Sequence, residues 1–193
     1  MNAEIAKRIT RRWFFQECGV GLVAIRRGAE RLAFEAPPLR RSGTLPPEMR
    51  ERIARALGLG VGDIRADQWV DNGPAWCAVM LHSAAQVLAL RPDFALLGDL
   101  MLGVVGAHPP GHDAQFEVRA FAPGLGVPED PVTGSLNAGL ARWLIGAGLA
   151  PARYVATQGA ALQRAGRVHV EQDADTTWIG GDVAPCIEGE VEL

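Results

Sequence analysis

The sequence is poor in cysteine, with three in 193 residues: Cys18, Cys77 and Cys186. An odd number of cysteines cannot all form pairs, and their spacings of 59 and 109 residues do not match a zinc-binding motif. The sequence therefore predicts no disulfide framework and no metal site. Free thiols fit a reducing cytoplasm, which is where we expect the protein to be located.

Long hydrophobic runs and a strong excess of either charge are also missing. The longest apolar stretch, 94–107, is interrupted by Asp99 and is shorter than the roughly 20 residues of a membrane-spanning helix. The first 15 residues are basic but contain no apolar run typical of a secretory signal. The net charge of −3 comes from 19 basic and 22 acidic residues, so neither a membrane nor nucleic acid is an expected partner.

Hydrophobic residues make up 48% of the chain, which is enough for a well-packed core, and their pattern favours an α+β fold. Residues 20–25 and 31–36 read as a β-hairpin. After a Pro-rich linker, Thr44 is expected to cap a helix with apolar residues at Met49, Ile53 and Leu57. Further strands are expected at 68–70, 75–81, 102–107 and 116–121, a short helix at 93–100, a longer helix from 134 or 135 to 145, and strands and turns from 154 onward.

The segment 121–139, FAPGLGVPEDPVTGSLNAG, contains the most chemically informative residues. Asp130 precedes a proline, and Thr133, Gly134 and Ser135 present backbone N–H groups at the start of the longer helix. A helix N-terminus attracts anions. The segment therefore predicts an anion-binding site beside a carboxylate, unless Asp130 only caps the helix and the glycines only form turns.

Residues 119–136, RAFAPGLGVPEDPVTGSL, closely resemble the signature of the phenazine-biosynthesis (PhzF-like) isomerase family. The resemblance extends along most of the chain, from the hairpin at 19–38 to the closing hairpins near 166–189. It implies the fold of diaminopimelate epimerase, which has two similar domains, each a sheet wrapped around a central helix. On this reading the chain has one complete copy of that domain at 44–182, a remnant of the other at 1–43, and a closing strand at 183–193.

The same resemblance implies an isomerase or epimerase that shifts a proton on a small carboxylate-bearing substrate without a cofactor. Asp130 would hold or protonate a polar group of the substrate, and the N–H groups of Thr133, Gly134 and Ser135 would hold the carboxylate. Asn72 and Gly73 resemble a substrate-facing loop of the family, although an Asn-Gly pair is also a common turn.

Two family motifs are absent from these 193 residues: S-E-T, whose glutamate is the family's acid/base, and G-H-A-T. We therefore expect this chain alone to bind small acids weakly and to show negligible turnover. The alternative is a non-catalytic module that binds a small acid or a protein partner. Because apolar residues at Leu22, Phe34 and Ile187 would lack their usual cover, we expect a homodimer or a partner that supplies the missing half.

Several weaker signals favour structural roles. His108 and His112 have the spacing of zinc ligands on a helix, but the Pro-Pro-Gly sequence between them excludes that helix. Arg119 is either a solvated strand residue or a partner that orients Asp130. The remaining residues are expected to be structural: the GVGLVA string at 19–24, Cys77, Trp76, Trp143 and Trp178.

Overall fold

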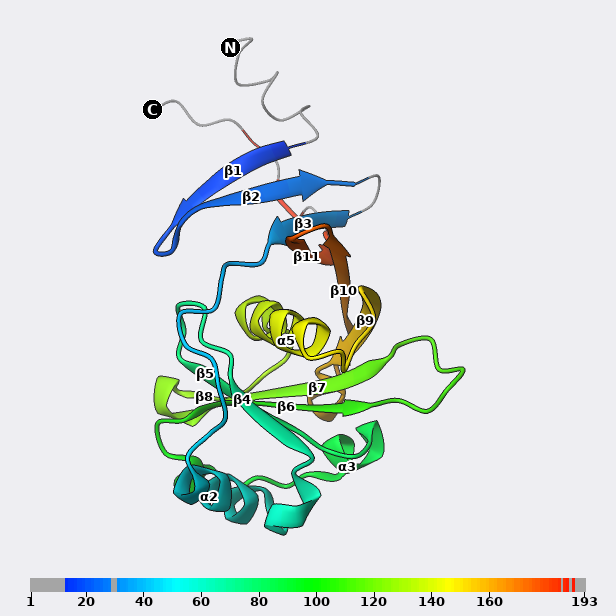
Figure 1. Ribbon diagram of the computed structural model, residues 1–193. Helices are drawn as coiled ribbons and strands as arrows, with labels where there is room; N and C mark the ends of the chain where they lie inside the picture. The colour runs from blue at the N-terminus through cyan, green and yellow to red at the C-terminus, as the bar shows by residue number, and fades with distance from the viewer. Residues whose placement is uncertain (1–12, 29–30, 185, 188, 190–193) are drawn as a thin grey trace.

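The computed structural model describes residues 13–28, 31–184, 186–187 and 189. They form an α+β fold with one large sheet and few helices (Figure 1). The strands are β1 (Trp13–Cys18), β2 (Gly21–Arg27), β3 (Arg31–Glu35), β4 (Ala66–Trp69), β5 (Trp76–Met80), β6 (Met101–Ala107), β7 (Phe116–Ala122), β8 (Val127–Asp130), β9 (Arg153–Gln158), β10 (Gly166–Asp173) and β11 (Thr176–Asp182). The α-helices are α2 (Pro47–Leu57), α3 (Ala84–Ala89), α4 (Phe94–Leu97) and α5 (Gly134–Gly146), with short 3-10 turns at 61–63, 123–125 and 160–162.

The strands follow one another across the sheet in the order β1-β2-β3-β11-β10-β9-β7-β6-β5-β4, and β8 pairs with β7. Two neighbouring pairs are parallel, β5 with β6 and β7 with β9, and the others are antiparallel. The expected hairpin at 20–36 is confirmed as β2 and β3. Because β3 also pairs with β11, the hairpin and the rest of the described chain share one continuous sheet.

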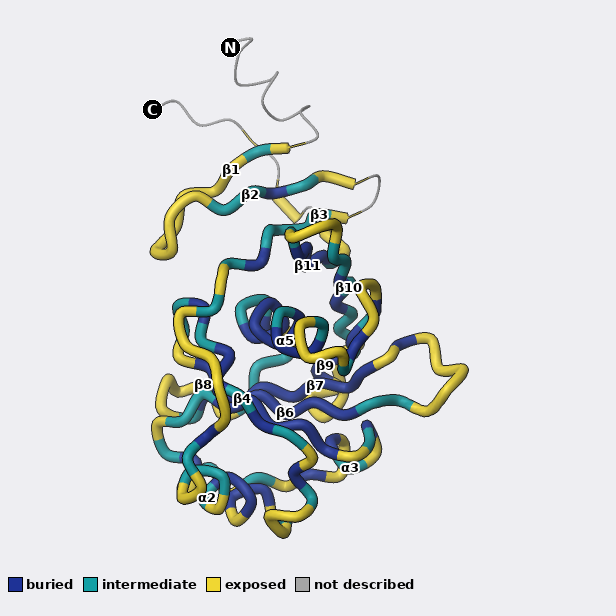
Figure 2. Tube along the Cα trace, viewed as in Figure 1, coloured by how far each residue is buried: buried dark blue, intermediate teal, exposed yellow. Residues whose placement is uncertain are grey.

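Helix α5 lies inside the curve of the sheet, with strands β5 to β7 on one side and β9 to β11 on another (Figure 1). Its expected apolar stripe is confirmed, since Leu136, Leu140, Trp143 and Leu144 are all buried. Figure 2 shows that α5 and β5 to β7 are mostly buried, whereas β1 is mostly exposed and β2 is partly covered. This helix therefore organises the main core of the molecule.

Helices α2, α3 and α4 cover the opposite face of β4 to β7 and enclose a second core. The expected helix with Met49, Ile53 and Leu57 is confirmed as α2, but its N-cap is Pro46 rather than Thr44. Pro47 supplies the fixed φ of the first helical position, so this helix begins without a side-chain cap.

Several short elements differ from the expected ones. The helix expected at 93–100 is only the turn α4, capped by Asp93, and helix α3 was not expected at all. Strand β11 ends at Asp182, and the described residues after it are not in a strand. The rest of the expected closing strand, residues 185, 188 and 190–193, lies outside the described residues.

None of the helices in the described part of the chain is long and apolar enough to cross a membrane. The thiols of Cys18, Cys77 and Cys186 are all free. Cys77 is fully buried in β5, and burial raises the pKa of its thiol to about 12, so it behaves as a small core residue, as expected.

Candidate functional site

The N-terminus of α5 is held by a buried polar network centred on Gln158. The N-cap residue is Thr133, and its backbone N–H donates to Gln158 Oε1 at 3.2 Å. Gln158 Nε2 donates both to the Thr133 hydroxyl and to the backbone carbonyl of Asp130. Asn137 completes the network by donating to Gln158 Oε1 at 2.8 Å. The Thr133 N–H is therefore already used, contrary to the expectation that it binds a substrate.

Asp130 lies at the end of β8, three residues before the N-cap. Its Oδ2 accepts a hydrogen bond of 2.6 Å from the Thr133 hydroxyl, while no described residue donates to its Oδ1. The N–H groups of Gly134 and Ser135 do not donate to any other described residue. The carboxylate thus contacts the N-cap side chain rather than the first two N–H groups of the helix. The carboxylate Oδ1 and these two N–H groups can therefore still bind an external partner.

The turn at 71–74 faces the same helix end. Gly73 has φ +137°, and its N–H is held by Asp71 Oδ1 at 2.9 Å. A Cβ at Gly73 would lie 2.9 Å from Val20 of the hairpin, so both backbone geometry and space require glycine. The close approach brings this turn against the hairpin.

Asn72 is 2% exposed and donates to the Ser135 carbonyl at 2.8 Å. Its Oδ1 is buried without a hydrogen-bond partner among the described residues. A buried acceptor without a partner costs free energy, so such an atom is a marker of a missing ligand or water. Ser135 Oγ accepts from Trp76 Nε1 at 3.0 Å, which leaves its own hydroxyl hydrogen free to donate.

Asn72 and Ser135 both line a cavity of about 240 Å³ between the end of α5 and the hairpin. The other lining residues, mostly apolar and from the hairpin and its exit, are Gln16, Cys18, Val20, Val23, Ile25, Phe34, Pro37 and Pro74. We call this space the α5 cavity. Asp130, Thr133, Gly73 and Gly134 are near it in the chain but are not among its lining residues.

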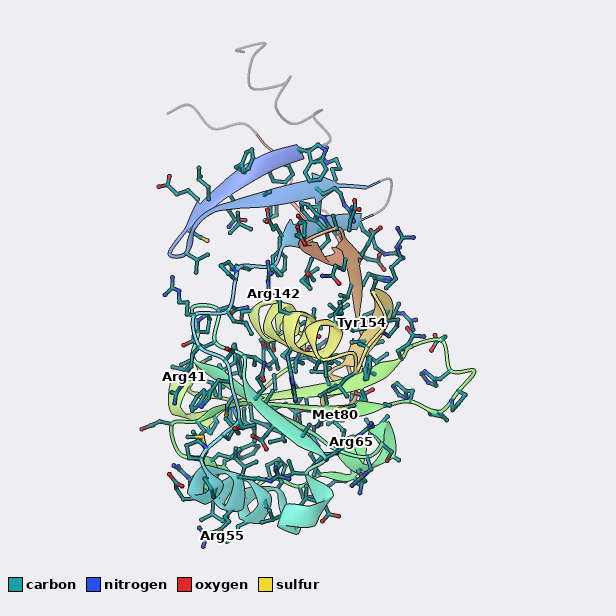
Figure 3. All side chains as sticks on the ribbon, in the orientation of Figure 1. Arg41, Arg55, Arg65, Met80, Arg142 and Tyr154 are labelled. Atoms are coloured by element: carbon teal, nitrogen blue, oxygen red, sulfur yellow. The ribbon has the colours of Figure 1, made fainter. Side chains whose placement is uncertain are left out.

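The hairpin is fixed over this cavity by contacts with α5. Arg142 of α5 donates to the carbonyls of Ala36 and Pro37, directly after β3 (Figure 3). A Cβ at Gly134 would lie 3.4 Å from the Phe34 ring, so the helix end packs closely under β3. Phe34 therefore faces α5, whereas Leu22 is 72% exposed. The ladder places them on opposite faces of the sheet, because Phe34 pairs with Ile25 and Leu22 lies three residues before Ile25 on β2. The expected lack of cover therefore applies to Leu22 but not to Phe34, which packs against the main core.

Arg119 does not orient Asp130. Its guanidinium forms two parallel hydrogen bonds with Glu129, at 2.9 and 2.7 Å, and also donates to the carbonyls of Val87 and Leu90. Both side chains are buried. Glu129, the carboxylate directly before Asp130 in the sequence, is therefore held in a structural ion pair.

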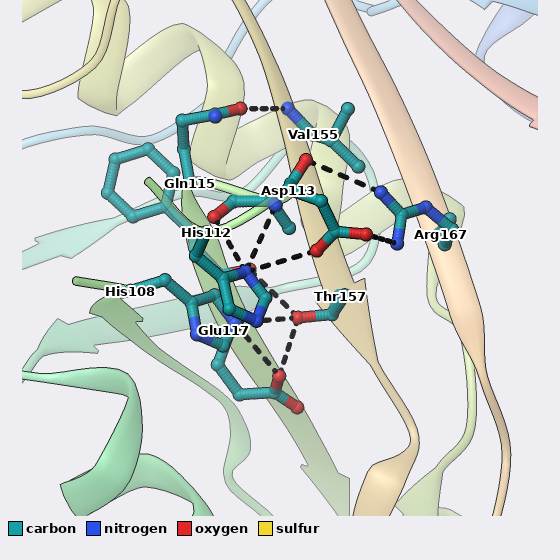
Figure 4. Close-up of polar contacts among 10 residues, drawn as sticks. His108, His112, Asp113, Gln115, Glu117, Val155, Thr157 and Arg167 are labelled. Carbon is teal, nitrogen blue, oxygen red and sulfur yellow. Dashed lines mark hydrogen bonds and ion pairs between the residues drawn. The ribbon is translucent and has the colours of Figure 1, made fainter. Parts of the chain in front are cut away.

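The two spaced histidines belong to a separate cluster at the ends of β6 and β7 (Figure 4). The rings of His108 and His112 stack with centroids 3.8 Å apart. His108 Nε2 lies 2.9 Å from the Thr157 hydroxyl, which donates to Glu117 at 2.6 Å. In the part of the chain that the structure describes, no group of three or more His, Cys, Asp or Glu residues is arranged to hold a metal ion.

Gln158 and Cys18 were not identified as site residues from the sequence. Gln158 lies at the end of β9, 25 residues after Thr133, and only the fold brings the two together. Cys18 lies at the end of β1, and the pairing of β1 with β2 places it at the α5 cavity. Its position in a strand sequence does not predict this contact. The sequence signal for Gln158 is that this polar residue ends a buried strand and precedes a glycine.

Residues 4–189 match the family described as "Phenazine biosynthesis-like protein", PhzC-PhzF. Antisense-enhancing sequence 1 of Schizosaccharomyces pombe is 29% identical over 196 residues, covering 91% of this chain and 65% of that protein. An uncharacterized isomerase of Pseudomonas aeruginosa is 29% identical over 174 residues, covering 90% of this chain and 62% of that protein. The chain thus spans less than two thirds of the length of these curated relatives.

Solved structures show the same fold. A PhzF family phenazine biosynthesis protein from Enterococcus faecalis matches with a TM-score of 0.70 at 24% identity, over 95% of this chain and 66% of that one. A predicted epimerase from Pseudomonas aeruginosa matches with a TM-score of 0.67 at 20% identity, over 88% of this chain and 63% of that one. Because the family match spans nearly the whole sequence, the chain belongs to the PhzC-PhzF family of phenazine biosynthesis-like proteins, several of whose relatives are named isomerases.

Proposed function

We propose that this chain provides one half of an isomerase or epimerase active site, in which a small carboxylate-bearing substrate binds at the N-terminus of α5. The observation that carries the proposal is the α5 cavity. There the buried Asn72 Oδ1 has no hydrogen-bond partner among the described residues, and the hydroxyl hydrogen of the nearby Ser135 is not used by any of them. Names of relatives such as "uncharacterized isomerase" and "predicted epimerase" support the reaction class.

The polar groups suggest which ligand fits. The Ser135 hydroxyl and the N–H groups of Gly134 and Ser135 are donors at the positive end of a 13-residue helix, and they suit a carboxylate. Asn72 Oδ1 is an acceptor and suits a ligand N–H or O–H. We therefore infer a substrate that carries a carboxylate and a nearby amino or hydroxyl group, such as an amino acid or a hydroxy acid. The remaining apolar lining accommodates its hydrocarbon part.

A proton shift needs groups that accept and return a proton. We propose that Asp130, whose Oδ1 accepts from no described residue, holds or protonates a polar group of the substrate. Glu129 does not supply a second base because Arg119 binds both of its oxygens. We propose that the second acid/base comes from a partner, either a second copy or another chain, and that the reaction uses no metal or organic cofactor. The free thiols support the proposed cytoplasmic location.

A second candidate is a module that binds a small acid and catalyses nothing. It is favoured by the position of Asp130, which does not line the α5 cavity. Both candidates require the same binding site, and they differ only in whether any proton exchange at a substrate carbon takes place.

Titration of the chain with small amino, hydroxy and aromatic acids, followed by ¹H–¹⁵N NMR, tests the binding. We expect affinities in the millimolar range, with shifts at Ser135 and Asn72 that weaken in Ser135→Ala and Asp130→Ala. Ser42→Ala, which changes an exposed serine in the linker, is the matched control. Absence of binding by every acid would refute both candidates.

Exchange of substrate protons in D₂O then separates the two candidates. Loss of the general acid/base typically lowers a rate by roughly 10²–10⁴-fold, so the chain alone should show negligible exchange. Exchange that appears when a second chain is added would support the shared active site. Exchange that never appears would favour the binding module.

A further inference from the structure

The outer face of the sheet, on the side away from the α5 cavity, carries a trough across five strands. Cross-strand neighbours form one row from β2 to β9, and they are Arg26, Ala33, Gly180, His169 and Val155. Residues directly opposite one another in a ladder share a face, so all five are on the same side of the sheet. Ala33 and Gly180 leave the middle of the row almost without side chains.

The cavity along this row has a volume of about 500 Å³. This is within the range of small-molecule sites. The α5 cavity is lined instead by Val23, Ile25 and Phe34, which alternate with the residues of the row and therefore face the other way. The trough and the α5 cavity are thus separate.

Large charged side chains form the walls. Glu171 lies between Arg26 and Arg153 and pairs with both, and these arginines hold the pKa of its carboxyl below its usual range. On the other side, Arg31 pairs with Asp182 at 2.7 Å. Three arginines against two carboxylates leave an excess of one positive charge along the walls, which favours an anion.

The floor contains an unused hydrogen-bonding group. His169 Nε2 is buried and has no hydrogen-bond partner among the described residues. Burial and the nearby Arg31 lower the pKa of His169 below 6.5, so at pH 7 most of the rings are neutral and have a single N–H. His169 lines the trough, and with that hydrogen on Nε2 its ring can donate to an anionic oxygen that reaches this buried nitrogen.

We propose that this trough binds a small organic anion through a carboxylate or phosphate group, with His169 Nε2–H on the floor and Arg31 and Arg153 on the walls. The site is independent of the proposed isomerase function. Such a ligand would satisfy the buried nitrogen, which otherwise costs free energy, and would neutralise the excess positive charge.

The test uses calorimetric titration of the whole 193-residue chain with inorganic phosphate and, separately, with succinate. We expect saturable binding of at least one, and the tighter of the two identifies the anionic group. Ala33→Val keeps every charge, suits a strand and fills the trough, while His169→Leu removes the donor. Each should weaken binding about tenfold or more, His169→Leu because a hydrogen bond to a charged group is lost and Ala33→Val because the larger side chain takes up space that the ligand needs.

Arg65→Ala is the matched control, because it removes an exposed arginine next to β4, at the opposite edge of the sheet (Figure 3). Binding should be unchanged in this variant. Because succinate is a small acid that can also enter the α5 cavity, the titration is repeated in Ser135→Ala, and the binding that persists in that variant is assigned to the trough. The proposal is wrong if neither anion binds, if Ala33→Val binds like the wild type, or if Arg65→Ala weakens binding as much as the trough variants.

Discussion

Arg119 holds both carboxylate oxygens of Glu129, and this pairing separates Glu129 from its neighbour Asp130. Successive residues of a strand point to opposite faces. Glu129 points with Arg119 toward the carbonyls of Val87 and Leu90, at the end of α3. Asp130 contacts Thr133, at the start of α5. Of two adjacent acids, only one is therefore available to the candidate site.

Replacing Arg119 by alanine should lower the free energy of unfolding by about 3–5 kcal/mol, because it leaves the buried Glu129 charge unpaired. Denaturant unfolding followed by circular dichroism measures this. The double variant Arg119→Met with Glu129→Leu, which removes both charges, should recover much of the loss. Equal stability of the single and double variants would contradict a tightly coupled pair.

Gly139 allows α5 to approach the loop after β4. A Cβ there would lie 2.4 Å from the Val70 carbonyl oxygen, which is backbone and has little room to move. Gly139→Ala should therefore destabilise the protein by about 1–3 kcal/mol. Gly146→Ala, at the end of the same helix and in open space, is the control, and it should be neutral or slightly stabilising by helix propensity. Similar Tm values for the two variants would contradict this packing.

The cluster of His108 and Glu117 makes stability depend on pH. Although Glu117 Oε2 lies 3.4 Å from His108 Nε2, burial and the stacked His112 lower the pKa of His108 below its ordinary value of 6.5. The unfolded chain therefore takes up a proton first on acidification, and this histidine's contribution to stability is lost as the pH falls below 6.5. His108→Gln should flatten the loss of stability between about pH 7 and pH 5.

Urea unfolding at several pH values checks this, with His82→Gln at an exposed histidine as the control for the substitution itself. Burial raises the pKa of Glu117, which acts in the opposite direction: its contribution falls as the pH rises above 4.5. If the free energy of unfolding falls more steeply with decreasing pH in His108→Gln than in the wild type, the histidine is charged in the folded protein and the prediction is wrong.

The proposed self-association should depend on the outer face of the hairpin. Phe15 and Leu22 are 68% and 72% exposed and lie on the same face of β1 and β2. Phe15→Ser with Leu22→Ser should shift a dimer to monomer in sedimentation velocity, because it removes apolar area from the interface. Val61→Ser, at an exposed apolar residue near α2, is the control. A wild-type chain that sediments as a monomer at tens of micromolar would end this proposal.

The sequence determined the main elements because their patterns are local. The apolar spacing of Leu136, Leu140 and Leu144 predicts α5, and the alternating hairpin predicts β2 and β3. The order of residues 130–135 predicts the start of α5 at Gly134 or Ser135, because the signals of a helix N-terminus lie in neighbouring positions, and the helix does begin at Gly134. Helix α3 was missed because its six residues are too short for a periodic signal.

The sequence alone could not decide which predicted site residues have free hydrogen-bonding groups. Only the tertiary structure shows that Arg119 binds Glu129, that the Thr133 N–H binds Gln158, and that Asn72 Oδ1 has no partner within the described part of the chain. The hydrogen bonds that decide these outcomes join residues 10 to 63 positions apart in the chain. Local propensity sets where helices and strands begin, but the pairing of buried polar groups depends on the whole packed fold. That pairing decides which polar groups are used within the structure and which remain available to a ligand.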